Sequence, residues 1–400
     1  MTTYNFDKIT NRKGTNCLKY DFAVERGKPA DVLPLWVADM DFPVSEEITK
    51  SLHAAVEHGI YGYTQPKDAY YNAVMNWMER NHNWKTEREW IVKTPGVVFA
   101  LGAAVKAFTD PGDAILIQNP VYYPFTNIIR DNDRRVVDNT LIYEKTAGQS
   151  GDNGYRIDFE DFERKLEQEH IKLFILCNPH NPVGRVWTVE ELQQLGEICL
   201  RHHVIVVSDE IHNDFVYPGY EHTVFATVDP RFAEFTVTCT APSKTFNLAG
   251  LQISNIFIPN EKLRKAFQTE IDKTGYDEPN ALGIVACEAA YRAGEDWLDQ
   301  LRAYLLKNLN FLRNFLQEKI PQIHLVEPEG TYLVWLDCSE LGITGKELDQ
   351  FIVDKAGLWL DGGSMFGPSG AAFQRVNIAC PQATLELALN KLKAAVDNLK

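Results

Sequence analysis

The sequence predicts an α/β protein, with a large domain whose mostly parallel sheet is covered by helices on both faces and a smaller α+β domain. Apolar, strand-like runs alternate with helical patterns up to about residue 290, as they do in proteins built from βαβ units. The run Leu173–Cys177 is continuously apolar, which suits a strand buried on both faces. Beyond a long helical pattern that starts near Trp297, the order of strands and helices changes, and this change indicates a second domain.

Helix signals and strand signals can be followed in order along the first part of the chain. Helical periodicity runs over residues 95–108 and ends at an Asp-Pro-Gly stop signal, after which residues 114–117 are apolar and predict a strand. Thr188 and Glu191 have the spacing of a capping box, which predicts a helix that continues to about His202.

The remaining elements follow from apolar runs and from helical spacing. Trp297, Leu301, Leu305 and Leu312 predict a long helix that links the two domains. Further strands are expected at 204–208, 235–240, 331–337 and 375–379, and further helices near 346–355 and 384–399.

Composition and charge exclude several classes of protein. A chain of 400 residues with 45% hydrophobic content can bury a substantial core. A net charge of −15 without a block of Lys or Arg makes nucleic acid an unfavourable partner. No apolar run approaches a membrane span of about 20 residues, and residues 1–14 lack a signal-peptide pattern. Seven scattered cysteines without metal-ligand spacing suit a reduced cytoplasm, and we expect no metal site.

Polar groups follow three of the predicted strands at the points where they end. Asn178-Pro-His-Asn181-Pro follows the strand at 173–177, Asp209 follows the strand at 204–208, and Lys244 lies in a loop just past 235–240. Ligands of open α/β sheets bind at this carboxyl edge of the strands. Asp209 is costly there unless a positive charge pairs with it, and a deprotonated lysine can hold an aldehyde cofactor as a Schiff base. A solvated surface lysine is the alternative for Lys244 taken alone.

These motifs resemble those of fold-type I enzymes that use pyridoxal 5′-phosphate (PLP). More narrowly, the chain is similar to the cystathionine β-lyase and cystalysin-type C–S lyases within the class I/II aminotransferase superfamily. The resemblance runs in order from about Trp36 to the C-terminus. The shared segments are 34–42 (PLWVADMDF), 61–64 (YGYT), 119–125 (NPVYYPF), 178–184 (NPHNPVG), 208–212 (SDEIH), 219–223 (GYEHT), 241–247 (APSKTFN) and 374–379 (QRVNIA).

The resemblance implies an aspartate aminotransferase-like fold and a division of the chain into two domains. Residues 46–290 would form the large PLP-binding domain, and residues 1–45 would join residues 291–400 in the small domain. It also implies roles for residues around the cofactor ring. Lys244 would carry the cofactor and move protons, Asp209 would pair with the pyridine nitrogen, and Asn181 would bind the phenolic oxygen.

Tyr122 is at the position where the family stacks an aromatic ring on the cofactor. Packing under a loop is the alternative role for Tyr122, and it applies more strongly to Tyr123. His212 is counted with the cofactor-binding residues, although aspartate aminotransferases carry a tyrosine there. Gln252 replaces their phosphate-binding arginine. Both departures fit the C–S lyase branch better than a straightforward transaminase.

The cofactor phosphate would bind at the start of the helix near Val97 and Val98, where backbone N–H groups are free, and at the hydroxyl of Ser243. Tyr63 would reach the phosphate of the neighbouring subunit, so the resemblance implies a homodimer.

The substrate carboxylate would be held by Arg375, whose guanidinium can bind it through two hydrogen bonds, assisted by backbone N–H groups at Val37 and Ala38. A buried structural ion pair is the alternative role for Arg375.

The expected activity is PLP-dependent β-elimination of L-cystathionine and related cysteine conjugates or cysteine, giving thiol, pyruvate and ammonia. An aminotransferase with the same cofactor site is the nearest alternative. A regulatory protein that keeps the fold and binds a partner is another, but it would not need the set of Lys244, Asp209, Asn181 and Arg375.

Overall fold

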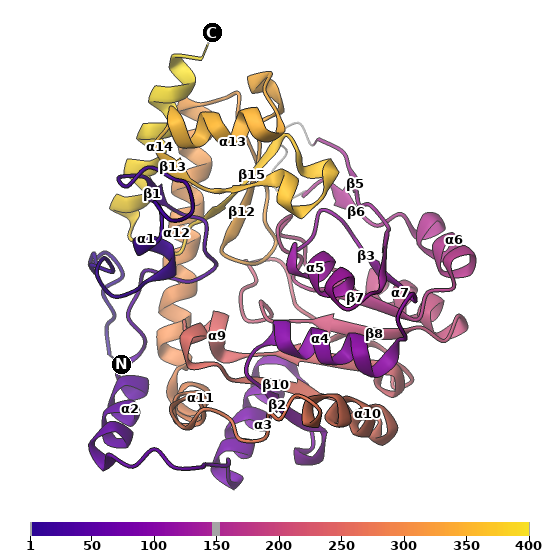
Figure 1. The fold of residues 1–400 in the computed structure, drawn as a ribbon. Helices are drawn as coiled ribbons and strands as arrows, with labels where there is room; N and C mark the ends of the chain where they lie inside the picture. The colour runs from indigo at the N-terminus through magenta and orange to yellow at the C-terminus, as the bar shows by residue number, and fades with distance from the viewer. Residues whose placement is uncertain (1, 146–152, 400) are drawn as a thin grey trace.

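A seven-stranded sheet forms the centre of the protein in the computed structural model, which describes residues 2–145 and 153–399 (Figure 1). Its strand order is β2-β10-β9-β8-β7-β3-β4. Only β10 runs antiparallel to its neighbours, which confirms the predicted α/β class with a mostly parallel sheet. The strands are β2 (Ile91–Thr94), β3 (Ala114–Ile117), β4 (Arg135–Asp138), β7 (Leu173–Cys177), β8 (Ile205–Asp209), β9 (Thr236–Thr240) and β10 (Ser254–Phe257).

Helices cover both faces of this sheet, because alternate residues of each strand point to opposite sides. Ile115 and Ile175 pack in a cluster with α4, α5 and α10, whereas Leu116 and Phe174 pack with α6 and α7. Continuously apolar strands are therefore required, as the sequence of β7 indicates. The covering helices are α4 (Val97–Phe108), α5 (Pro124–Asp131), α6 (Phe159–Glu169), α7 (Val189–Arg201) and α10 (Glu261–Asp272).

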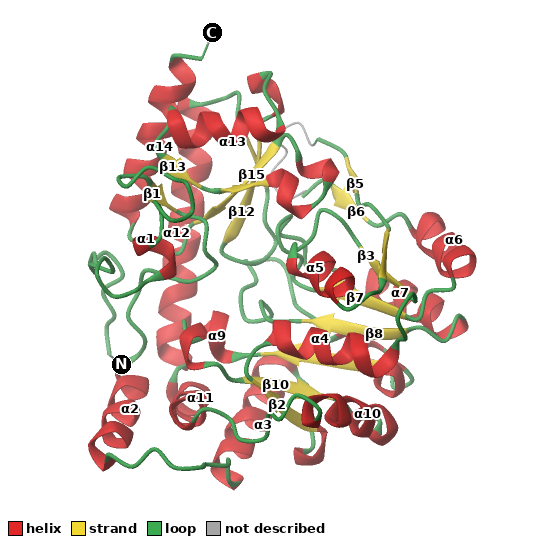
Figure 2. Cartoon of the chain, in the orientation of Figure 1, coloured by secondary structure: helices red, strands yellow, loops and turns green. Residues whose placement is uncertain are grey.

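A smaller antiparallel sheet lies in the C-terminal part of the chain, and Figure 2 shows the two sheets as separate groups of strands. Its order is β11-β12-β15-β14, and the long helix α12 runs from beside α11 to beside α14 (Figure 1). The elements here are α12 (Glu295–Lys319), β11 (His324–Val326), β12 (Leu333–Asp337), α13 (Gly345–Asp354), β13 (Leu358–Trp359), β14 (Asp361–Gly362), β15 (Phe373–Asn377) and α14 (Gln382–Asp397).

The N-terminal segment joins the C-terminal part through strand pairing, because β1 pairs in parallel with β13. The remaining elements are α1 (Leu18–Asp21), β1 (Leu33–Pro34), α2 (Glu46–His58), α3 (Asp68–His82), β5 (Ile142–Tyr143), β6 (Tyr155–Arg156), α8 (Phe225–Val228), α9 (Pro242–Thr245) and α11 (Ala281–Ala293), with 3-10 turns η1 (Arg88–Trp90), η2 (Phe232–Phe235), η3 (Ala249–Leu251), η4 (Ser339–Leu341), η5 (Gly363–Phe366) and η6 (Pro368–Gly370).

One apolar cluster connects the two predicted domains, since it contains Trp77 of α3, Leu301 of α12 and Leu389 of α14. The domain boundaries near residues 46 and 290 stay a prediction. Within the described ranges, none of the helices combines the length and apolar character needed to cross a bilayer.

Several predicted elements are confirmed with small shifts of their ends. The capping box of Thr188 and Glu191 is present with both hydrogen bonds at the start of α7. The strand predicted at 375–379 is instead β15 (Phe373–Asn377), whose last residue still pairs with Leu333 of β12. There the Asn377 side chain donates to the Val37 and Asp39 carbonyls, each at 2.6 Å, and accepts from Ala379 N–H.

The packing of α7 generates a prediction about stability. A Cβ atom added at Gly196 would lie 2.0 Å from the ring of buried Phe232, whereas one added at Gly102 of α4 would meet no atom within 4 Å. We expect Gly196→Ala to destabilise the protein by about 1–3 kcal/mol through overpacking. Gly102→Ala, the matched control, should stabilise it by roughly 0.8–1.0 kcal/mol because alanine favours helix. Urea denaturation measures both, and equal effects of the two changes would contradict this account.

Candidate active site

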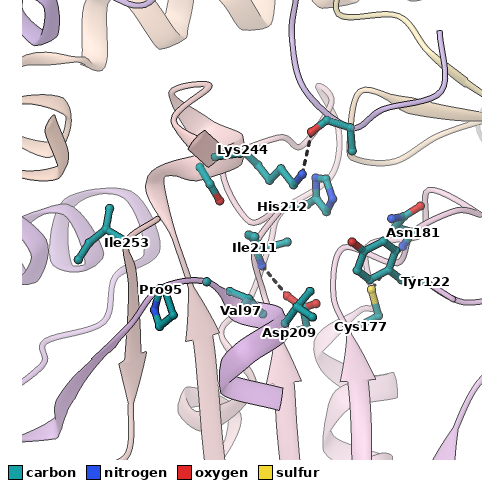
Figure 3. Close-up of a pocket in the computed structure, with 15 residues that line it drawn as sticks. Pro95, Val97, Tyr122, Cys177, Asn181, Asp209, Ile211, His212, Lys244 and Ile253 are labelled. Atoms are coloured by element: carbon teal, nitrogen blue, oxygen red, sulfur yellow. Dashed lines mark hydrogen bonds between the residues drawn. The ribbon is translucent and has the colours of Figure 1, made fainter. Parts of the chain in front are cut away.

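A cavity of about 180 Å³ lies at the carboxyl edge of β7, β8 and β9, and we refer to it as the central cavity (Figure 3). It brings together side chains from strand ends, from the start of α4 and from the N-terminal segment. The predicted site residues that line it are Ala38, Val97, Val98, Tyr122, Asn181, Asp209, His212, Ser243 and Lys244.

Lys244 lies on α9, a single helical turn that directly follows β9. Its Nζ donates a hydrogen bond to the Ala38 carbonyl oxygen at 2.7 Å. Burial and the positive charge of Arg375 lower the pKa of Lys244 to about 8, while Asp39 and Asp209 act in the opposite direction. An amine with this pKa is far more often neutral at physiological pH than an ordinary lysine, so a larger fraction of it can react as a nucleophile or accept a proton.

Asp209 is the last residue of β8 rather than the first residue after it, and its side chain is buried. Within the described residues, its carboxylate accepts one hydrogen bond, from Ile211 N–H at 3.2 Å. Burial raises the pKa of Asp209 to about 7. A cation placed against this carboxylate would offset the cost of burying its charge.

Arg375 does not line the central cavity but is joined to it through Asn181. One guanidinium nitrogen donates to Asn181 Oδ1 at 3.0 Å, and the other donates to the Trp36 carbonyl at 2.9 Å. The second nitrogen also forms a buried ion pair with Asp361. Arg375 therefore forms a buried ion pair, which was the alternative to its expected role in binding the substrate carboxylate. Its Nε remains buried without a partner in residues 2–145 and 153–399, so donor capacity is left for a ligand.

His212 lies beside Lys244 (Figure 3). Its ring packs edge-on against Tyr332, with ring centroids 5.8 Å apart. Burial, together with the charges of Lys244 and Arg375, holds the pKa of His212 well below its usual range, so the ring is neutral at pH 7. Its Nδ1 is buried and has no hydrogen-bond partner in the described parts of the chain. A buried orphan nitrogen of this kind indicates a group that a ligand would satisfy.

Tyr122 and Tyr123 lie in different environments, although they are adjacent in sequence. The Tyr122 ring lines the central cavity, and burial raises the pKa of its hydroxyl. Tyr123 faces away from that cavity and packs against Phe366 at a ring-centroid distance of 6.1 Å. Of the two, only Tyr122 can contact a ring bound in the central cavity.

The start of α4 lies at the central cavity and presents backbone N–H groups to it. Gly96 precedes the helix, its first turn contains no acidic residue, and no side chain of the described residues caps its N–H groups. Ser243 lines the same cavity. Backbone N–H groups and a hydroxyl are suitable donors for a phosphate group. Gln252 does not line this cavity within the described residues and caps the short turn η3 instead.

Tyr63 and Val37 lie outside the central cavity. Tyr63 lies in the link between α2 and α3, and 95% of its side chain is exposed. The Val37 carbonyl oxygen accepts the bond from Asn377 described above. Asp39 and Asp41 form a partly buried ion network with Arg12 and Lys19.

Sequence reasoning missed residues that hold the lysine turn in place. Asp214 accepts hydrogen bonds from Thr245 Oγ1 at 2.6 Å, His82 Nε2 at 3.0 Å and Trp77 Nε1 at 3.2 Å. Asn247 donates to the Met40 carbonyl at 2.9 Å. Asp361 was also missed, although an acidic residue after an apolar run is the signal that identified Asp209.

The chain matches the family described as aminotransferase class I and II over residues 30–392. It is 46% identical to cystathionine beta-lyase PatB of Bacillus subtilis over 392 residues, which cover 98% of this chain and 100% of PatB. It is 31% identical to protein MalY of Escherichia coli, with 96% of each chain covered.

Solved structures of similar proteins contain the expected cofactor. Cystalysin from Treponema denticola, which contains PLP, has a TM-score of 0.95 and 38% identity, with 100% of both chains covered. The PLP-bound C–S lyase from Staphylococcus hominis has a TM-score of 0.91 and 35% identity, covering 99% of this chain and 98% of that one. With its family match, its relatives and its fold in agreement, the chain belongs to the aminotransferase class I and II family.

Proposed function

We propose that this protein is a PLP-dependent carbon–sulfur β-lyase that acts on L-cystathionine and related cysteine S-conjugates or cysteine. The products are a thiol, pyruvate and ammonia. The observation that carries the proposal is the convergence of Lys244, Asp209 and Asn181 on one cavity, in a chain whose similar proteins include a cystathionine beta-lyase and PLP-bound C–S lyases.

The residues of the central cavity fit PLP. Lys244 would hold the aldehyde carbon, the α4 N-terminus and Ser243 would bind the phosphate, and Tyr122 would cover the ring. Asp209, buried with a single hydrogen bond, would gain a cation in the protonated pyridine nitrogen. The orphan Nδ1 of His212 would gain a polar partner.

Arg375 and Lys244 would then have separate roles in the reaction. Arg375, fixed by Asn181 and Asp361, binds the substrate carboxylate. Lys244, whose pKa is lowered to about 8, takes the proton from the α-carbon and returns it later. When bound, PLP supplies an electron sink for the carbanion that results. The thiolate then departs from the β-carbon with the electron pair of the broken C–S bond.

We also propose a homodimer in a reducing compartment, the cytoplasm. Tyr63 lies in an exposed segment with Ile60 and Tyr61, which are 71% and 60% exposed, and such a cluster suits a subunit contact. All seven cysteines are free thiols, as expected under reducing conditions.

The reaction type is tested by offering the protein cystathionine and, separately, alanine with 2-oxoglutarate. Alanine has no leaving group, so it can only transaminate or racemise. We expect kcat/KM for pyruvate and thiol release from cystathionine to be well above that for alanine transamination. The reverse order would make the protein an aminotransferase. Tracking pyruvate and free thiol in parallel separates the two.

The role of Lys244 is tested by trapping. Borohydride reduction of the PLP-loaded protein should fix the cofactor to the peptide that contains Lys244, since this lysine lines the cavity. Lys244→Ala should lose both the label and nearly all turnover. Lys273→Ala, a change on an exposed lysine, is the control and should retain both. Mass spectrometry that finds the label on another lysine would contradict the assignment.

The electrostatics of the cavity predict how PLP capture depends on pH. The neutral amine is the reactive form, so the capture rate should rise with pH through about 8, the lowered pKa of Lys244, rather than through 10.5. Asp209 raises that pKa, so Asp209→Asn should move the midpoint to lower pH. Stopped-flow absorbance measures the profile. A midpoint that stays in place or moves upward in the variant would refute this coupling.

A further inference from the structure

Two of the shared sequence segments, 208–212 (SDEIH) and 219–223 (GYEHT), meet through a buried contact that the functions described above do not use. Glu210, which is fully buried, accepts a hydrogen bond from His222 Nε2 at 3.1 Å. Its other oxygen accepts bonds from the Ser208 hydroxyl at 2.8 Å and from Phe225 N–H at 3.0 Å. Donors thus meet both oxygens of this carboxylate, an arrangement that stabilises its ionised form.

Glu210 follows Asp209 directly in the chain, but the two side chains lie on opposite sides of β8. Asp209 lines the central cavity (Figure 3). Consecutive strand residues point to opposite faces of a sheet, so Ser208 points away from that cavity, and its hydrogen bond holds Glu210 on the same side. A second carboxylate is therefore held on the far side of the strand from the one expected to pair with the cofactor nitrogen.

The hydrogen bonds of His222 indicate that Glu210 keeps its charge. No lysine or arginine of the described residues forms an ion pair with Glu210, and His222 is its basic partner. The Nδ1 atom of His222 is buried and has no partner in residues 2–145 and 153–399. A doubly protonated ring would leave a buried N–H unpaired, so these contacts favour a neutral ring that carries its hydrogen on Nε2. The pair of Glu210 and His222 then has a net negative charge.

The other titratable groups around the two carboxylates do not cancel this charge. Lys244 is the cation that faces Asp209. On the other side of β8, the His82 ring of α3 packs edge-on against His222, with ring centroids 5.7 Å apart, and has Asp214 as its own partner. Three further groups are neutral at pH 7 because burial raises their pKa above the usual value. They are Cys177 of β7, Cys239 of β9 and Tyr122.

A negative charge at Glu210 favours a proton on the cavity side of the strand. Burial is the main cause that raises the pKa of Asp209 to about 7, and the charge of Glu210 acts in the same direction, against Ile211 N–H and Lys244. A protonated pyridine nitrogen is a cation, so the same charge would stabilise it next to Asp209.

We propose that Glu210 and His222 are positioning residues for the cofactor's proton: the charge of Glu210, held by His222, acts through Asp209 and retains the proton on the pyridine nitrogen. The inference rests on the PLP site of the proposed function, and it holds whether the bound amino acid undergoes elimination or transamination. It gives a role to the segment 219–223, whose five described residues all lie outside the lining of the central cavity.

The first test compares equilibrium binding of two cofactors to the cofactor-free protein, PLP and 1-deazapyridoxal 5′-phosphate, which has a carbon in place of the pyridine nitrogen. The wild type should bind PLP more tightly, because only PLP can pair a protonated nitrogen with Asp209. In Glu210→Gln this preference should fall by about 10-fold, the effect of one nearby charge on one proton equilibrium at an effective dielectric constant of about 20. Glu221→Gln, which removes an exposed charge from the same segment, is the control and should keep the preference.

Two changes at His222 separate charge from structure. His222→Phe removes the donor to Glu210 and should lower the preference for PLP, whereas His222→Gln supplies an amide donor and should restore it. A merely structural role would weaken the binding of both cofactors alike and leave the preference as it is in the wild type. An unchanged preference in Glu210→Gln would therefore overturn the proposal, and so would an equal fall in Glu221→Gln.

The second test observes the proton itself. NMR of the protein loaded with 15N-labelled PLP distinguishes a protonated ring nitrogen from an unprotonated one. The pH at which this nitrogen loses its proton should be about one unit lower in Glu210→Gln than in the wild type, because a cation loses a nearby negative charge. A midpoint that stays in place or rises would refute the role of Glu210. A wild type that binds neither cofactor would instead refute the PLP site, so the two failures are distinguishable.

Discussion

The position of Lys244 depends on buried hydrogen bonds that hold its single helical turn from two sides. On one side Asp214 accepts the Thr245 hydroxyl, together with donors from α3. On the other side Asn247 binds the backbone at Met40, in the segment whose Ala38 carbonyl receives the lysine itself. Because Asp214 and Thr245 are both buried, losing either partner of their hydrogen bond would cost about 1–3 kcal/mol. The reactive amine is thus located by the N-terminal segment and the large sheet together.

This arrangement also explains the charge distribution around the central cavity. Lys244 and Arg375 bring positive charge to a buried region, and the charge of Arg375 raises the cost of ionising Lys244. Asp361 compensates Arg375, but Asp209 has no comparable ion-pair partner within the described residues. The protein therefore has a lysine whose pKa is lowered to about 8 and a buried carboxylate whose charge a bound cation would stabilise. A lysine of lowered pKa and a buried carboxylate without an ion-pair partner are both typical of functional sites and uncommon in a purely structural core.

Much of the fold and site could be predicted because the signals are local. Continuous apolar strands such as β7, the capping box of α7 and the polar residues at strand ends are all read from neighbouring positions. Asp214 was missed because its partners Thr245 and His82 lie 31 and 132 residues away in the chain. The end of β15 was misplaced for the same reason: the Asn377 side chain binds backbone that is 340 residues away. Sequence periodicity carries no information about such contacts.

The contacts expected for the cofactor do not by themselves decide between β-elimination and transamination. Lys244, Asp209 and Asn181 line the central cavity and would serve an aminotransferase equally well. His212 and Gln252, in contrast, depart from the aspartate aminotransferase pattern. Whether a thiol is expelled also depends on the substrate, because a cysteine conjugate carries a leaving group on its β-carbon and alanine does not. The reaction type is therefore set by the amino acid that the site accepts as well as by the cofactor contacts.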